Sequence, residues 1–237
     1  MTDSVLTSSE GETRTLKKLY PFLRCDGKTD CKDFTDEIDC RVIEFDSSYN
    51  KFLSPPVEEE EGHTKLSVLT SVSLHSVSSL DPILASYEAE FTVTLKWRDE
   101  RLRFNNLRAE SNMNSIRPAE AEKIWFPEFY FDNTREKVQN IIDDSAVLRV
   151  LRNGSGVLSS SEDTENKLIF QGGENWLQYQ RFYSQLFHCH FYLHWYPFDR
   201  QSCYIDILPA SDIRVVRFLN EDLIELISLG FCVPGSR

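Results

Sequence analysis

The stretch YEAEFTVTLKW, residues 87–97, constrains the fold more than any other part of the chain. Apolar side chains occupy every second position, and polar side chains fill the positions between them. Successive side chains of a strand point to opposite faces, so this alternation predicts a half-buried antiparallel strand with one face in water. The inward set is Tyr87, Ala89, Phe91, Val93, Leu95 and Trp97, and the outward set is Glu88, Glu90, Thr92, Thr94 and Lys96.

The same period of two recurs along the chain. LSVLTSVSL, residues 66–74, places Leu66, Val68, Val72 and Leu74 on one face. Further strands are expected, between turn signals, at 147–151, 167–171, 179–193, 203–208 and 213–218. Many strands and few helices predict an all-β fold, an immunoglobulin-like β-sandwich of about ten strands.

Composition divides the chain into four segments. Residues 1–20 are polar and predict a disordered leader, whereas residues 21–40 form a small module rich in Cys and Asp. Pro55-Pro56 and an acidic run after it mark residues 41–63 as a linker and lead-in. The sandwich is predicted over 64–237, and we expect it to be incomplete at the C-terminal end.

Charge and hydropathy narrow the classes of function. The formal net charge of −12 over 237 residues argues against nucleic acid as a partner, because phosphate backbones repel an acidic surface. No apolar run is long enough to cross a bilayer, and the N-terminus shows no signal peptide. The chain also has no nucleophile motif and no Gly-rich phosphate loop, so we expect a protein that is not an enzyme.

The stretch HCHFYLHWYPFDRQSC, residues 188–203, is compatible with three structures. A disulfide between its two cysteines would close a loop with a proline at the turn and would stabilise the fold by roughly 3 kcal/mol. Two histidines on one strand face could instead bind zinc with a third histidine or a cysteine. The candidate zinc ligands are His188, His190, His194 and Cys203. The third possibility is an ordinary strand with packed aromatic side chains.

The spacing of Cys189 and Cys203, with Tyr-Pro-Phe-Asp between them, resembles the signature loop of the pentameric Cys-loop ligand-gated ion channels. Three other stretches resemble motifs of that family in the order in which it carries them. They are YNKFLSPP at 49–56, WRDERLRF at 97–104 and WFPEFYFDN at 125–133. The resemblance extends over residues 47–218, most of an extracellular ligand-binding domain, and WRDERLRF is more similar to the anion-channel branch than to the nicotinic one.

This resemblance implies a β-sandwich that assembles with like subunits into a ring of five, with a small-molecule or ion ligand between neighbours. It implies a disulfide between Cys189 and Cys203 and a gating loop that couples ligand binding to pore opening. The gating loop is Trp195, Tyr196, Pro197, Phe198 and Asp199. The implied location is the extracellular side of the cell membrane, with the membrane reached through pore segments that this sequence lacks.

The ligand-binding positions implied by the resemblance are few. Tyr130 and Asp132 match positions that line ligand sites in the family. Thr92 stands where members often carry an aromatic residue, and Thr94 stands where some members carry an arginine. Their absence weakens binding of a quaternary ammonium and of a carboxylate, respectively. Separately, Asn153 begins a sequon for glycosylation. The alternative function is a soluble secreted ligand- or zinc-binding protein of the same fold without a pore.

LRCDGKTDCKDFTDEIDC, residues 23–40, resembles the second half of an LDL-receptor class A module, which holds a calcium ion. The ligands implied by that resemblance are the carboxylates of Asp26, Asp30, Asp36 and Glu37 and the carbonyls of Leu23 and Lys28. The resemblance also implies a disulfide between Cys25 and Cys40. Cys31 then lacks its usual partner, because the first three cysteines of a complete module are absent.

Overall fold

The computed structural model describes residues 28–29, 41–56, 66–135, 139, 141, 147–158, 168–195, 198, 201–210 and 216–220. Its strands are β1 (Ile43–Phe45), β2 (Leu66–Asp81), β3 (Ser86–Trp97), β4 (Leu102–Asn105), β5 (Phe129–Phe131), β6 (Val147–Leu151), β7 (Val157–Leu158), β8 (Leu168–Gln171), β9 (Trp176–His188), β10 (Ile207–Pro209) and β11 (Val216–Asn220). The helical segments are α1 (Pro118–Ala121), η2 (Ser111–Met113) and η3 (Leu193–Trp195).

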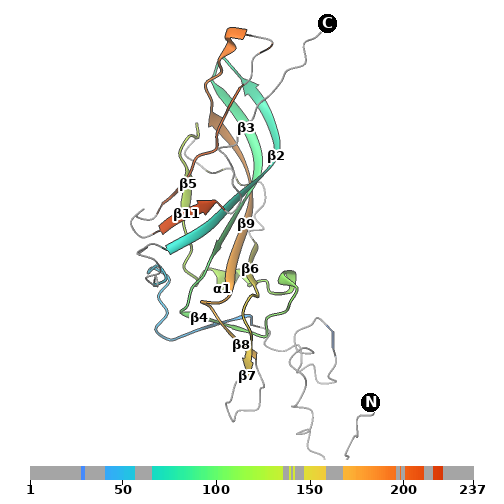
Figure 1. The fold of residues 1–237 in the computed structure, drawn as a ribbon, viewed down its shortest axis with the longest axis vertical. Helices are drawn as coiled ribbons and strands as arrows, with labels where there is room; N and C mark the ends of the chain where they lie inside the picture. The colour runs from blue at the N-terminus through green and yellow to red at the C-terminus, as the bar shows by residue number, and fades with distance from the viewer. Residues whose placement is uncertain are drawn as a thin grey trace, which may run out of the picture.

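A five-stranded sheet in the order β11-β2-β3-β9-β6 forms the long body of the molecule (Figure 1). β3 pairs antiparallel with β2 and β9 along nearly its whole length, whereas β11 joins β2 in parallel. A second sheet, β1-β4-β8-β7, lies toward one end of the long axis, and β10 and β5 form a separate pair (Figure 1). The predicted all-β architecture is confirmed.

The alternation predicted for residues 87–97 is confirmed in β3, where all six inward side chains are fully buried. Phe91 lies at the centre of an aromatic layer. Its ring centroid is 5.3 Å from that of Phe131, 5.8 Å from Tyr183 and 5.7 Å from Phe187. Since Phe131 belongs to β5 and the other two belong to β9, β5 covers the inner face of the five-stranded sheet. This aromatic layer is the centre of the sandwich core.

A β-bulge at His75 interrupts the alternation of β2. The pairing of β2 with β3 shifts between Leu74 and Ser76, so the extra residue is left out of the ladder. The His75 side chain lies on the outer face, where its Nε2 is 2.7 Å from Thr92 Oγ1 and its ring packs edge-on against Phe182. Thr92 was predicted to face water, but this contact leaves it only 9% exposed.

Several predicted boundaries were wrong. β9 spans Trp176–His188 instead of 179–193, and β10 contains only Ile207–Pro209 instead of 203–208. In the first case the cysteine-bounded loop takes residues 189–193, which the aromatic pattern had assigned to the strand. β1 lies inside the predicted linker 41–63, because Ile43 is buried and its segment pairs with β4. Three alternating residues are too few for the period to be visible in the sequence.

The stretches YNKFLSPP, WRDERLRF and WFPEFYFDN meet around Arg101. The Arg101 guanidinium donates to both carboxylate oxygens of the buried Asp99, at 2.8 and 2.7 Å, and to two backbone carbonyls of the 49–56 segment. It also lies over the ring of Tyr49, 4.8 Å from its centroid. The Tyr49 hydroxyl donates to Asp99 at 3.1 Å and accepts the Trp125 N–H at 2.9 Å. We call Arg101, Asp99 and Tyr49 the Arg101 cluster.

The protonated side chain of Tyr49 contributes to the free energy of unfolding, and this contribution is lost at alkaline pH. Burial, followed by the nearby Asp99 carboxylate, raises its pKa from 10.0 to about 12. The folded chain therefore holds this proton at a pH where the unfolded chain has lost it. The contribution of Tyr49 to the free energy of unfolding is complete below about pH 10 and is lost as the pH rises through about 12.

We therefore expect the urea midpoint to fall between about pH 9 and about pH 11, and to fall less in Tyr49→Phe. Burial also raises the pKa of Tyr87 and of Tyr183, so part of the decrease remains in that variant. Chemical denaturation followed by tryptophan fluorescence measures both midpoints. An equal decrease in the two proteins would contradict the assignment to Tyr49.

Candidate ligand-binding face

A disulfide joins Cys189 and Cys203, whose Cα atoms are 5.4 Å apart. This bridge confirms the predicted pairing and removes Cys203 as a zinc ligand, and both cysteines are buried. His188 and His190 are exposed. Across the part of the chain that the structure describes, no group of three or more His, Cys, Asp or Glu side chains is placed to hold a metal ion. The zinc alternative therefore has no geometric support there.

The loop closed by this disulfide is fixed at its base. The Cys189 N–H donates to the carbonyl of Ala85, the residue directly before β3, over 2.9 Å. Further along, Gln201 forms a reciprocal pair with the backbone of Tyr192. The Gln201 side chain accepts the Tyr192 N–H at 2.8 Å and donates to the Tyr192 carbonyl at 3.0 Å. These bonds hold the loop beside the β2–β3 hairpin.

Exposed apolar side chains gather where this loop meets the hairpin. Figure 1 shows η3 and the β2–β3 hairpin at the same end of the long axis. We call this group the apolar end; it consists of Leu80, Ile83, Leu84, Tyr192, Leu193 and Phe198. Of the predicted gating loop, Trp195 closes η3 and Phe198 is 85% exposed. Tyr196, Pro197 and Asp199 lie outside the described residues.

Replacing Cys189 and Cys203 together with serine should lower the free energy of unfolding by about 3 kcal/mol. This is the loop-closure entropy expected when a bridge spans a sequence separation of 14 residues. Urea unfolding of the oxidised wild type and of the double variant measures the difference, with the reduced wild type as control. Mass mapping that finds both thiols free in protein from an oxidising secretory host would contradict the pairing.

The outer face of the five-stranded sheet carries Thr92 and Thr94. In the β-ladder Thr94 lies directly opposite Gln180 of β9, and Thr92 lies opposite Phe182. The hydroxyl of Thr92 is engaged by His75, whereas Thr94 is half-buried. Thr94 is therefore the more accessible of the two predicted positions.

Arg149 lies on the same face and was missed by the sequence analysis. It sits opposite Gln178 in the β6–β9 ladder, and its guanidinium donates to Gln180 Oε1 at 3.3 Å and to Asn112 Oδ1 at 2.6 Å. The available signal was the alternation of VLRVL in β6, where the neighbours of Arg149 are buried and Arg149 is not. The ligand face is defined here as His75, Thr92, Thr94, Lys96, Arg149, Gln180 and Phe182.

The ligand face has the chemistry to hold a carboxylate. A guanidinium presents its donors in a planar fork that matches a carboxylate, and Arg149 retains a buried Nε–H with no hydrogen-bond partner in the structure. Thr94 and Gln180 add neutral hydrogen-bonding groups, and Lys96 adds a second positive charge. Glu88 and Glu90 lie nearer the hairpin and accept hydrogen bonds from serines. The positive charge thus lies at the end of the face that is farther from the hairpin.

Tyr130 and Asp132 are not brought together with Thr92 and Thr94. Tyr130 belongs to β5, pairs with Leu208 of β10 and is 44% exposed, pointing away from the core. Asp132 follows the same strand and is also exposed. The four predicted residues therefore lie on two separate surfaces, one on the outer face of the long sheet and one on β5.

The predicted glycosylation site and the predicted calcium site are described only in part by the structure. Asn153 is exposed just after β6, and its backbone N–H donates to Asn175 Oδ1 at 2.9 Å; its glycosylation stays a prediction. Of the predicted calcium ligands only Lys28 is described, and it is exposed. The remaining ligands and the Cys25–Cys40 pair lie outside the described residues. No helix in the described part of the chain has the length and hydropathy to cross a membrane.

Comparison with known proteins identifies relatives among neurotransmitter receptors. The glutamate-gated chloride channel of Drosophila melanogaster is 28% identical over 93 residues, which are 39% of this chain and 20% of the relative. The gamma-aminobutyric acid receptor subunit beta-like protein of Drosophila melanogaster is 26% identical over 147 residues, which are 54% of this chain and 26% of the relative. The gamma-aminobutyric acid receptor subunit beta of Lymnaea stagnalis is 26% identical over 198 residues, 80% of this chain and 34% of the relative.

The chain therefore matches only 20–34% of the length of these relatives. The sequence pattern described as the neurotransmitter-gated ion-channel ligand binding domain matches residues 41–211, which contain the disulfide-closed loop, the Arg101 cluster and the whole ligand face. It describes part of an ion channel and not an enzyme. This chain belongs to the family of neurotransmitter-gated ion-channel ligand-binding domains.

Proposed function

We propose that this chain is the extracellular ligand-binding domain of a pentameric ligand-gated channel subunit in the cell membrane, and that its ligand face takes a small molecule with a carboxylate group. The observation that carries the proposal is the Arg149 guanidinium, which shares one face with Thr94 and Gln180. The names of two relatives refer to glutamate and to gamma-aminobutyric acid, and both of these molecules carry a carboxylate.

The separation of the predicted residues suits a site shared between two subunits. A closed ring of identical subunits uses head-to-tail contacts, in which one face of a subunit meets a different face of its neighbour. The ligand face then provides one wall of each site, and the surface of β5 around Tyr130 on the next subunit provides the other.

The apolar end is the surface that would transmit ligand binding to a pore. Exposed apolar side chains that cluster on one surface mark contacts with another protein or with a membrane domain. Ile83 is 94% exposed and Phe198 is 85% exposed, and both lie where the disulfide-closed loop meets the hairpin. In an assembled receptor, Ile83→Ser should reduce the maximal current while ligand binding to the outer face is unchanged.

Ligand binding tests the proposed function directly. Secreted, disulfide-bonded protein is titrated with glutamate and with 4-aminobutyrate by calorimetry. Arg149→Gln should raise the dissociation constant of the bound ligand by about tenfold or more, because a charge-assisted hydrogen bond contributes about 1.5–3 kcal/mol. The matched control is Arg152→Gln, since Arg152 lies over Phe170 near the same strand and outside the ligand face. Equal affinities in the two variants would contradict the assignment.

We also propose that residues 21–40 bind calcium, which rests on the resemblance of residues 23–40 to an LDL-receptor class A module. Thermal unfolding with calcium and with a chelator tests it. Asp36→Asn should abolish a calcium-dependent rise in Tm, because a carboxylate ligand is lost. A Tm that does not respond to calcium in the unaltered chain would contradict the proposal.

A further inference from the structure

Asn133, which follows the end of β5, forms hydrogen bonds on both sides of the disulfide bridge. Its carbonyl accepts the N–H of His188, the residue directly before the first cysteine, at 2.8 Å. Its side-chain Nδ2 donates to the carbonyl of Tyr204, the residue directly after the second cysteine, at 2.6 Å, and its Oδ1 accepts the Asp206 N–H at 3.1 Å. One residue thus holds both arms of the disulfide-closed loop, which we define as His188 and the segment 204–206.

The side chain of Asn133 prolongs the pairing of β5 with β10 beyond the end of their ladder. The last registered pair on this side is Phe131 with Ile207. One further bond runs from the Asp132 N–H to the Asp206 carbonyl, at 3.0 Å. A side-chain amide offers an acceptor and a donor, as a peptide group does. Asn133 therefore supplies through its side chain the next connection between the two segments, and it fixes the second arm of the loop to β5.

Both arms are also bonded to the start of β3, independently of β5. The hydroxyl of Tyr87, which is fully buried in β3, donates to the same Tyr204 carbonyl at 2.8 Å. A carbonyl oxygen has two lone pairs, so Tyr87 and Asn133 together use its full capacity. The first arm is bonded to the carbonyl of Ala85 through the N–H of Cys189. Each arm therefore lies between a bond to the start of β3 and a bond to Asn133.

The two attachments differ in how freely they can move. β3 is the central strand of the five-stranded sheet and has a paired strand on either side. β5 belongs to a two-stranded sheet, and its segment carries Tyr130 and Asp132 on the exposed side. A short strand pair is displaced at lower cost than a central strand, because fewer hydrogen bonds hold it. Movement of β5 would therefore shift both arms of the loop relative to a fixed β3.

We propose that Asn133 is the positioning residue through which the β5 surface moves the disulfide-closed loop, a role that rests on the proposed function. A ligand bound between two subunits displaces the segment around Tyr130. Asn133 carries this displacement to His188 and to the segment 204–206, and the loop carries it to the apolar end. Without the Asn133 side chain the second arm stays with β3 through the Tyr87 hydroxyl, so ligand binding no longer opens the pore.

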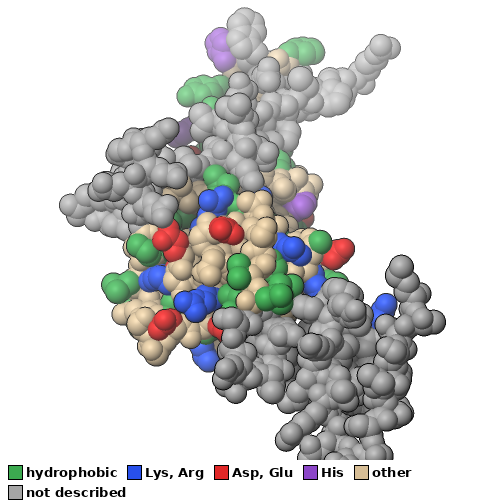
Figure 2. Space-filling model, turned by 60° about the horizontal axis from the view of Figure 1, so that its bottom comes forward, with side chains coloured by type: hydrophobic (Ala, Val, Ile, Leu, Met, Phe, Trp, Pro, Cys, Tyr) green, Lys and Arg blue, Asp and Glu red, His purple; other side chains and the backbone are tan. Residues whose placement is uncertain are grey.

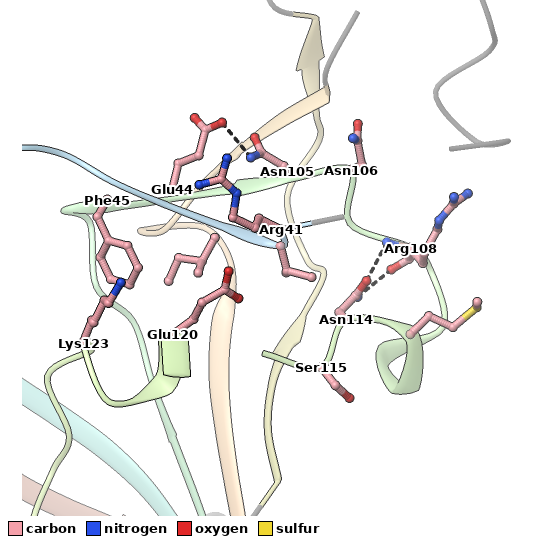
Figure 3. Close-up of a pocket in the computed structure, with 13 residues that line it drawn as sticks. Arg41, Glu44, Phe45, Asn105, Asn106, Arg108, Asn114, Ser115, Glu120 and Lys123 are labelled. Atoms are coloured by element: carbon pink, nitrogen blue, oxygen red, sulfur yellow. Dashed lines mark hydrogen bonds between the residues drawn. The ribbon is translucent and has the colours of Figure 1, made fainter. Parts of the chain in front are cut away.

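Asn114 offers a matched control, since it is another asparagine whose side chain bonds to backbone. Its Oδ1 accepts the Arg108 N–H at 2.8 Å and its Nδ2 donates to the Arg108 carbonyl at 2.9 Å, beside a cavity of about 430 Å³ (Figure 3). The same nitrogen donates to the Val150 carbonyl at 3.1 Å. Val150 pairs with Leu177 near the start of β9, whereas Asn133 bonds to the last residue of that strand. Asn114 therefore fixes backbone at the other end of β9.

Amide hydrogen exchange in the secreted, disulfide-bonded chain tests these bonds without any ligand. Asn133→Ala should speed exchange of the Asp206 and His188 amides by about tenfold or more, because the Asp206 N–H loses its acceptor and the segment that bonds to His188 loses its anchor. Asn114→Ala, which removes three side-chain hydrogen bonds, should leave both rates within about twofold. Unchanged exchange at both amides in Asn133→Ala would overturn the proposal.

The two variants differ in the hydrogen bonds that they remove and not in charge. Neither substitution adds or removes a charged group. Figure 2 brings forward the end of the long axis opposite the hairpin, where basic and acidic side chains are interspersed without a field of one sign. The exchange rates at the loop therefore report on hydrogen bonds and not on a difference in surface charge between the two ends.

Binding and current distinguish coupling from a purely structural role. Glutamate and 4-aminobutyrate are titrated into the chain by calorimetry, and the maximal current is recorded in the assembled receptor. Asn133→Ala should lower the maximal current by about tenfold, while the dissociation constant stays within about twofold. Loss of binding together with current, or an unchanged maximal current, would overturn the role in coupling. An unaltered chain that binds neither molecule would contradict the proposed function, and the exchange rates would still decide whether Asn133 holds the two arms.

Discussion

Phe91→Ala should lower the free energy of unfolding by about 4 kcal/mol, within the range of 3–5 kcal/mol seen when a buried aromatic ring is truncated. Phe91 is fully buried in β3 and its ring packs against rings from both β5 and β9. Its removal leaves a cavity at the point where the two layers of the sandwich meet. Urea unfolding monitored by circular dichroism measures the loss.

Phe52→Ala is the matched control, because the same side chain is removed from a position that is 83% exposed. We expect this variant to lie within about 0.5 kcal/mol of the unaltered chain. If the two alanine variants were equally stable, the aromatic layer around Phe91 would not be the core of the fold.

Arg101→Met should lower the free energy of unfolding by about 3–5 kcal/mol, as expected when one partner of a buried ion pair is removed. The Asp99 side chain has no exposed surface, while that of Arg101 is 23% exposed. Without the guanidinium the Asp99 carboxylate stays buried, with the Tyr49 hydroxyl as its remaining side-chain donor in the Arg101 cluster. The same change also releases two carbonyls of the 49–56 segment.

Arg103→Met provides the comparison, since Arg103 lies two residues away on the exposed side of β4. It should change stability by less than about 0.5 kcal/mol. Adding Asp99→Leu to Arg101→Met should restore part of the loss, because an apolar pair does not leave a charge buried. Equal stabilities for Arg101→Met and Arg103→Met would contradict the structural role of the Arg101 cluster.

Much of the fold could be predicted from alternation, because β3 is long enough for six inward positions to repeat. The same rule failed for β1, whose three residues cannot show a period, and for Thr92, whose burial depends on a bulge one strand away. The end of β9 was missed for a different reason. The aromatic residues near Cys189 follow a strand-like pattern, but the disulfide and the Gln201 pair fold them into a loop.

The candidate site was predictable only where a motif fixed a position. The pairing of Cys189 with Cys203 followed from a recognisable loop, whereas Arg149 lies in a short strand with no motif of its own. Its relevance depends on the β6–β9 register, which places it opposite Gln178 and within hydrogen-bonding distance of Gln180, the residue that pairs with Thr94. Register between distant strands is set by the packed sheet and cannot be read from local sequence.

The most direct measurement of the central claim is a structure of the assembled receptor with its ligand bound. We predict a ring of five subunits in which the carboxylate of the ligand lies within hydrogen-bonding distance of Arg149 of one subunit, with Tyr130 of the neighbouring subunit on the opposite side of the ligand. A ligand bound elsewhere, with Arg149 still directed only at Asn112 and Gln180, would contradict the account.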